Sequence, residues 1–68
     1  MKYLVIIEKS GNGFSAYSPD VPGCVAAAET IEETEALMAE ALEFHLEDIP
    51  ETERPIPQTK AVFMNVAA

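Results

Sequence analysis

The residues best suited to chemistry gather in one short stretch, residues 17–30, which reads YSPDVPGCVAAAET. It contains the only cysteine of the chain, Cys24, and a carboxylate, Asp20. A cysteine nucleophile needs a histidine, a cation or a helix N-terminus to lower its pKa. The only histidine, His45, lies much later in the chain, and nothing in the sequence indicates that it contacts Cys24. Because a free cysteine usually behaves as a small buried hydrophobe, we interpret Cys24 as a structural residue.

Asp20 has no evident partner for acid–base or metal chemistry. Hydrolases usually pair two carboxylates with different pKa values, and metal-dependent nucleases bring several carboxylates together around ions. Apart from Asp20 and Glu8, every acidic residue lies within residues 29–53. We therefore expect Asp20 to be a turn residue whose side chain accepts hydrogen bonds from nearby backbone amides.

The neighbours of Asp20 are residues that restrict or release the backbone. Pro19 and Pro22 fix φ, whereas Gly23 permits a conformation that a Cβ atom would forbid. This combination predicts a stiff corner between two strands. We favour that interpretation over a reactive loop.

The remaining residues predict no cofactor, metal or phosphate site. One cysteine and one histidine are too few for zinc, and Gly11 and Gly13 lack the lysine and helix start of a phosphate-binding loop. We interpret His45 as a satisfied core or interface residue on the apolar side of a helix. Met38 and Phe44 are candidates for the core.

Size and charge restrict the partners that the chain can have. Its 68 residues make one small domain, which has little stability margin without a disulfide, a metal or a second copy. The net charge is −8, so nucleic acid is a poor direct partner and a basic protein is a better one. No apolar run approaches the about 20 residues of a membrane span, and we expect a soluble cytoplasmic protein.

The acidic residues are concentrated rather than scattered. Ten of the twelve lie within residues 29–53, where there is no lysine or arginine. Glu40, Glu43 and Glu47 are the candidate residues for contact with a basic partner. The alternative is that they form an ordinary solvated surface.

Periodicity and turn residues predict the elements that would position these side chains. Asn12-Gly13 favours a hairpin, because both residues accept a positive φ. Thr30 followed by Glu33 is a capping box that starts a helix at Ile31, and Pro50 stops that helix. The predicted elements are strands at 2–9, 14–18 and 24–28, a hairpin turn at 10–13, the helix, a connector at 51–59 and a strand at 60–66.

The helix is predicted to be amphipathic. Its apolar side comprises Ile31, Thr34, Leu37, Met38, Ala41, Leu42 and His45, with Glu35 at the margin. Its polar side comprises Glu32, Glu33, Glu40, Glu43 and Glu47.

These elements predict an α+β fold of order β-β-β-α-β, a mostly antiparallel sheet with one helix packed on one face. A right-handed crossover would place the fourth strand beside the first and parallel to it. The first strand, with its unbroken apolar run, would then be central. One helix covers only one face, and the last strand would be an apolar edge, so we expect a homodimer or a larger assembly of dimers.

Several segments together resemble the HicB-type antitoxin family. They are KYLVIIEK, GFSAY, SPDVPGCV and EALEFHLED, and the resemblance runs from residue 2 to about residue 57. The signature is Tyr-x-Pro-Asp-x-Pro-Gly-Cys before a threonine-capped helix. Here its residues are Tyr17, Pro19, Asp20, Pro22, Gly23, Cys24 and Thr30.

The resemblance implies a partial RNase-H-like fold that lacks the catalytic carboxylates of that fold. It also implies the function of a type II antitoxin, which binds and neutralises a small basic HicA-type ribonuclease that cleaves mRNA. Inhibition would come from protein–protein contact, without catalysis by this chain. The alternative is a stand-alone regulatory or binding module that has the same fold but no toxin partner.

The chain departs from the family pattern in two respects. Many members carry a C-terminal DNA-binding domain, whereas this sequence ends at Ala68, so we expect a single domain over 1–68 and no direct operator binding. Ala28 stands where the family often has glycine, and we expect a negative φ there.

Overall fold

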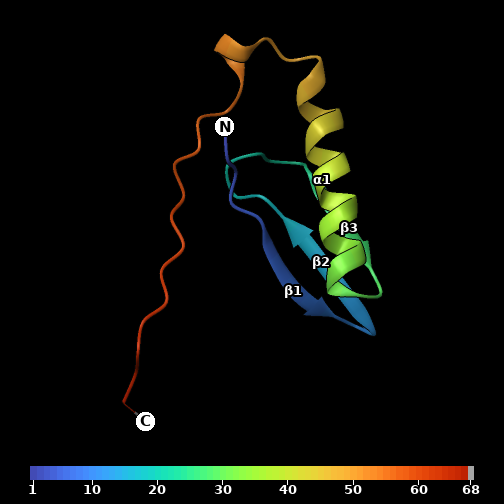
Figure 1. Ribbon diagram of the computed structural model, residues 1–68, viewed down its shortest axis with the longest axis vertical. Helices are drawn as coiled ribbons and strands as arrows, with labels where there is room; N and C mark the ends of the chain where they lie inside the picture. Colours follow the sequence, from blue (N-terminus) through green and yellow to red (C-terminus); the bar gives the residue numbers. More distant parts are fainter. Residues whose placement is uncertain (68) are drawn as a thin grey trace.

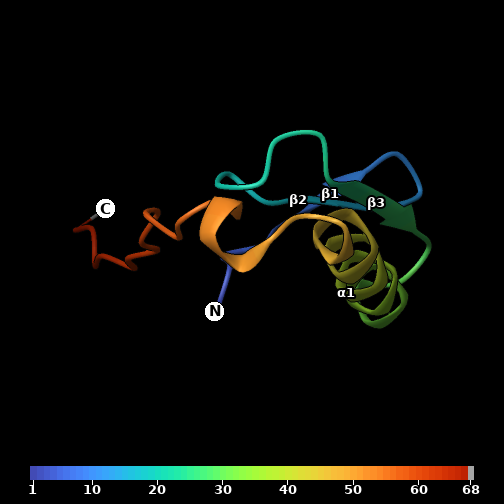
Figure 2. The same cartoon turned by 90° about the horizontal axis from the view of Figure 1, so that it is seen from above.

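The structure, a computed structural model, describes residues 1–67. It has the expected α+β architecture, with a three-stranded antiparallel sheet and one long helix on one face (Figures 1 and 2). The strands lie in the order β1-β2-β3, so β2 is central. The elements are β1 (Ile6–Ser10), β2 (Gly13–Tyr17), β3 (Val25–Ala28), α1 (Ile31–Glu47) and a short 3₁₀ helix, η1 (Glu51–Glu53).

The β1–β2 hairpin turn spans residues 10–13, as predicted, although Asn12 and Gly13 are not its central pair. Ser10 pairs with Gly13, so the two turn residues are Gly11 and Asn12. Gly11 has a φ of 58°, as a glycine at the first position of a tight hairpin turn does. Gly13 is needed for another reason, because a Cβ atom there would collide with the backbone oxygen of Ala28. Ala28 itself has a negative φ, as expected.

The first strand is shorter than predicted and lies at an edge of the sheet. Residues 2–5 form no ladder, since Pro19 follows soon after β2 and removes a donor opposite them. Instead, the hydroxyl of Ser18 donates to the backbone oxygen of Leu4 at 2.8 Å. The prediction that this strand is central is wrong for the described chain, because no strand pairs with its other edge.

The helix begins where the capping signal predicted. The Thr30 hydroxyl accepts a hydrogen bond from the Glu33 amide at 3.1 Å and donates to the Glu33 carboxylate at 3.0 Å. The carboxylate thus meets the threonine side chain and not its amide, the partner predicted for the capping box. The buried Thr34 hydroxyl donates to the Thr30 backbone oxygen at 2.7 Å, which secures the first turn.

The core is very small. Its buried apolar residues are Ala16, Val21, Cys24 and Met38. Met38 is only 1% exposed and joins α1 to the sheet. The helix lies mainly across β3 and β2 and contacts β1 least. The half-buried side chains packed around this core are Tyr3, Val5, Ile7, Ala26, Ala41, Leu42 and Leu46.

The predicted fourth strand does not form. Residues 60–66 are exposed and have no strand partner in the described chain, and we call them the arm. The arm runs beside the free-edge side of β1 but stands apart from the sheet in both views (Figures 1 and 2). Alternation of apolar side chains identified a segment that can be a strand, but it did not identify what pairs with it.

The connector that precedes the arm is fixed to the body. The Tyr3 hydroxyl donates to the backbone oxygen of Pro55 at 2.6 Å. The Asp20 carboxylate accepts from the backbone amides of Gln58 and Thr59, both at 3.0 Å, and from the Thr59 hydroxyl at 2.9 Å. Asp20 therefore joins the corner to a segment 38 residues away, whereas the sequence predicted that it would bond amides within the corner.

Replacing Thr30 with alanine should destabilise the fold by about 1 kcal/mol, because the helix loses its N-cap acceptor. Chemical denaturation measures this free energy of unfolding. Thr52→Ala, at an exposed threonine of η1, is the matched control and should change stability little. Equal effects of the two changes would contradict the capping role.

Replacing Asp20 with asparagine should speed hydrogen exchange at the amides of Gln58 and Thr59. The amide side chain has one acceptor atom and no charge, so it cannot hold all three donors. Exchange measured by NMR residue by residue reads this out directly. Glu8→Gln, at an exposed carboxylate, should leave both amides unchanged, and equal protection in both variants would show that Asp20 does not hold the connector.

The same contact should weaken in acid. The backbone amide of Thr59, with the other donors, holds the pKa of Asp20 below its ordinary value of 3.8. A lowered carboxyl pKa means that the contact is complete above 3.8 and is lost as the pH falls through the lowered value. The NMR shifts of the Gln58 and Thr59 amides should therefore be constant from pH 7 down to that range and then change together. A midpoint above 3.8 would contradict this.

Candidate protein-binding site

The corner that contains Cys24 is a packed structural element. Cys24 is only 3% exposed, and its burial raises the pKa of the thiol. A nucleophilic cysteine needs a shift in the opposite direction, so this thiol is poorly suited to attack. Val21 is buried beside it, which makes the corner part of the core, as the structural interpretation predicted.

The other signature residues also have local structural roles or surface positions. Gly23 has a φ of 85°, which explains a glycine at that point of the corner. Tyr17 ends β2 with its side chain 40% exposed, Pro19 is half-buried and Pro22 is exposed. The carboxylate of Asp20 is occupied by the connector. These residues form no cluster with the features of an active site.

The prediction of a core position was wrong for Phe44, and His45 does not lie in the core either. The interface role predicted for His45 stays a prediction. His45 is exposed although it falls on the predicted apolar side, because the last turns of α1 extend beyond the ends of the strands (Figure 1). Leu46 takes the half-buried position in its place. Phe44 is 77% exposed, whereas Met38 is buried as predicted.

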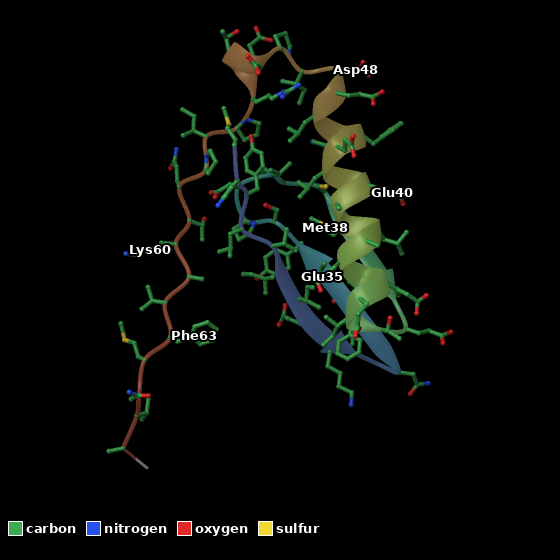
Figure 3. All side chains as sticks on the ribbon, in the orientation of Figure 1. Glu35, Met38, Glu40, Asp48, Lys60 and Phe63 are labelled. Atoms are coloured by element: carbon green, nitrogen blue, oxygen red, sulfur yellow. The ribbon has the colours of Figure 1, made fainter. Side chains whose placement is uncertain are left out.

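The outer face of α1, the side turned away from the sheet, is the candidate site. It carries Glu33, Glu40, Glu43 and Glu47 together with two exposed apolar residues, Leu37 and Phe44. In Figure 3, Glu40 points away from the sheet, on the side of the helix opposite Met38. Phe44 follows Glu40 by four residues and precedes Glu47 by three, so these side chains are neighbours on the helix surface.

This face combines charge with an apolar anchor. Its carboxylates lie on a segment without any lysine or arginine from residue 29 to residue 53. Leu37 is 44% exposed and lies two turns before Phe44, so both belong to one stripe. The carboxylates were predicted from the sequence, whereas Phe44 was not. The spacing of Phe44 from Glu40 and Glu47 indicates that it lies on the same face of the helix as they do. It was assigned to the core instead, because phenylalanine is usually buried.

One groove of about 220 Å³ lies between β1 and α1 and is lined by Val5, Ile7, Glu35, Met38, Ala39 and Leu42. We call it the edge groove. Over residues 1–67, no three His, Cys, Asp or Glu residues are grouped as metal ligands would be. Nor is any helix of that part of the chain long and apolar enough to cross a membrane.

Comparison with known proteins gives two similar relatives. The chain is 36% identical over 62 residues to an uncharacterised 14.9 kDa protein in the rep-hol intergenic region of Haemophilus phage HP1 (strain HP1c1). That match covers 91% of this chain and 47% of the phage protein, so the chain spans about half the length of that relative. It is also 32% identical over 57 residues to the UPF0150 protein ssr1765 of Synechocystis sp., covering 82% of this chain and 72% of that protein. No solved structure matches the chain.

Comparison with family models gives a further match, which covers more of the chain than either relative does. The model that describes the HicB-like antitoxin of bacterial toxin–antitoxin systems matches residues 3–68, which is nearly the whole sequence. The resemblance inferred from the corner motif and the helix is therefore confirmed. The chain belongs to the HicB-like antitoxin family.

Proposed function

We propose that this chain is the antitoxin of a type II toxin–antitoxin system, and that it binds and neutralises a small basic HicA-type ribonuclease that cleaves mRNA. Family membership supports an antitoxin role. The observation that carries the proposal is the outer face of α1, where the exposed Phe44 lies among Glu40, Glu43 and Glu47. We place the protein in the cytoplasm, where such a toxin meets its RNA, and we assign it no direct binding to nucleic acid.

The carboxylates of the outer face supply attraction at long range. A surface with charges of one sign raises the rate at which an oppositely charged partner arrives, and this effect weakens as salt screens it. Glu43 and Glu47 are one turn apart and repel each other mildly in the free protein. A cationic partner surface removes that repulsion when it binds.

The two apolar residues supply contact at short range. Exposed aromatic side chains that become buried at an interface account for much of the binding energy of protein complexes. Phe44 is the largest side chain of the outer face and is more exposed than Leu37. We therefore assign Phe44 the role of anchor and the carboxylates the role of orienting the partner around it.

Neutralisation by this route requires no reaction on the antitoxin. The groups that could react are engaged in the fold, because Cys24 is buried and protonated and Asp20 is bound to the connector. What the chain contributes is a rigid helix face that covers part of the toxin surface. The toxin then loses access to RNA. We further propose that the antitoxin acts as a homodimer or a larger assembly of dimers.

Reversing the charges of Glu40, Glu43 and Glu47 to lysine should slow association with the cognate toxin by roughly tenfold or more at low salt. The toxin to use is the product of an adjacent reading frame that encodes a short basic protein. Stopped-flow or surface-plasmon measurements of the association rate at several ionic strengths provide the readout. RNA cleavage assays with the same proteins show whether neutralisation follows binding.

The matched control reverses Glu8, Glu51 and Glu53 to lysine, which changes the net charge equally but leaves the outer face intact. It should slow association much less. A second variant, Phe44→Ser, should instead speed dissociation. If neither the outer-face variants nor salt alters binding, the face is only solvated surface. If no adjacent frame encodes a basic protein and none is captured, the chain is a stand-alone binding module.

A further inference from the structure

We infer that the arm, residues 60–66, pairs with the free edge of β1 in a second copy of this chain, so that two copies exchange arms. The inference rests on the homo-oligomer included in the proposed function and specifies its interface. It starts from the arm itself, which is apolar, extended and exposed. Phe63 is fully exposed, Val66 is 83%, Met64 79% and Val62 58% exposed.

Exposure of this kind needs a partner. Four large apolar side chains within five residues are costly to leave in water, and the alternation of the arm suits a strand. Lys60 and Phe63 extend from opposite sides of the arm in Figure 3, as expected for an extended segment. One side of an arm strand therefore carries Lys60, Val62, Met64 and Val66, and the other carries Phe63.

The body of the chain has an unfilled position for such a strand. β1 is at the edge of the sheet, and its outer backbone groups have no ladder partner within residues 1–67. Beside that edge, on the face that α1 covers, lies the edge groove, lined mainly by Val5, Ile7, Met38 and Leu42. If the arm is added to β1 as a strand, the side that carries Val62, Met64 and Val66 would face this groove.

The opposite face of the sheet offers the matching contact. Ile6, Tyr17 and Val25 lie in register across the three strands, on the face without the helix. Tyr17 is 40% and Val25 67% exposed. Phe63 of an added strand would lie beside Ile6, at the β1 end of this row. The arm would therefore cover apolar surface on both faces of the sheet.

Charge also fits this arrangement. Lys60 is the only charged residue of the arm. Glu35 is the only charged residue that lines the edge groove. The two side chains have opposite signs, and an arm seated along β1 brings Lys60 to the side of the sheet where Glu35 lies.

A second copy is the occupant because the arm of the same chain, although it runs on the free-edge side of β1, does not pair with that strand. Asp20 holds Gln58 and Thr59 at the corner, and beyond that point the arm stands apart from β1 in both views (Figures 1 and 2). Each chain therefore has one free arm and one free edge. Reciprocal exchange satisfies both and closes with two copies, without leaving an open end. It also doubles the contact between the two copies, because each arm covers one edge.

The test is the oligomeric state of the chain and of two phenylalanine variants. Sedimentation equilibrium should show a dimer for the unaltered chain. Phe63→Ser should weaken the dimer roughly tenfold or more, as the loss of an aromatic anchor does. Phe44→Ser replaces another exposed phenylalanine, on the outer face of α1, and should leave the dimer intact.

A second measurement identifies whose arm occupies the edge. In a refolded mixture of isotope-labelled and unlabelled chains, filtered NMR spectra should show contacts between the Phe63 ring of one copy and Ile6 of the other. A monomeric chain, or contacts only within one chain, would overturn the inference. A dimer unaffected by Phe63→Ser would overturn the arm exchange but leave the homo-oligomer standing. Toxin neutralisation is measured separately, so neither result depends on it.

Discussion

The packing of α1 against β2 and β3 is the contact on which the rest of the structure depends. Met38 is buried between the helix and the sheet, and the residues that receive it are small or come from the corner: Ala16, Val21 and Cys24. Alanine on the sheet lets the helix approach closely, but it also limits how much apolar area the contact can bury. The chain consequently has a tight and very small core. Its larger apolar side chains, among them Phe44 and Phe63, remain at the surface.

The corner shows how so small a core is reinforced. Val21 and Cys24 contribute to the core, while two residues before them, Ser18 and Asp20, bind other parts of the chain. Ser18 binds the backbone before β1, and Asp20 binds the connector after η1. One rigid turn thus links three segments that are far apart in the sequence. The prolines of this turn suit it to that role, because they restrict the unfolded chain and so reduce the entropy lost on folding.

Local signals predicted the local structure well. The threonine cap at Thr30 located the start of the helix, and the Asn12-Gly13 signal located the hairpin turn at residues 10–13. These features depend only on the conformations of a few adjacent residues. The types of those residues determine these conformations, so the features can be predicted from the sequence.

The predictions that failed concern contacts between distant segments. Helical periodicity assigned His45 to the covered side, but it cannot tell where the sheet beneath the helix ends. The turn preference of Asp20 gave no indication that Gln58 and Thr59 would supply its donors. For the candidate site, the carboxylates were predictable from charge, whereas the anchor Phe44 was assigned to the core by its residue type. The arm was recognised as a strand former, but its pairing depends on surfaces outside its own sequence.

The two surfaces assigned to partners lie on different sides of the molecule. The outer face of α1 is turned away from the sheet, and the arm leaves the body on the side of β1 that is remote from the helix (Figure 2). Exchange of arms along β1 therefore leaves Glu40 and Phe44 accessible in both copies. In the proposed dimer both helix faces would stay free, so self-association would not compete with the proposed binding of a toxin. The small size of the core accounts for both surfaces, because a core of four buried apolar residues leaves other large apolar side chains, such as Phe44 and Phe63, exposed.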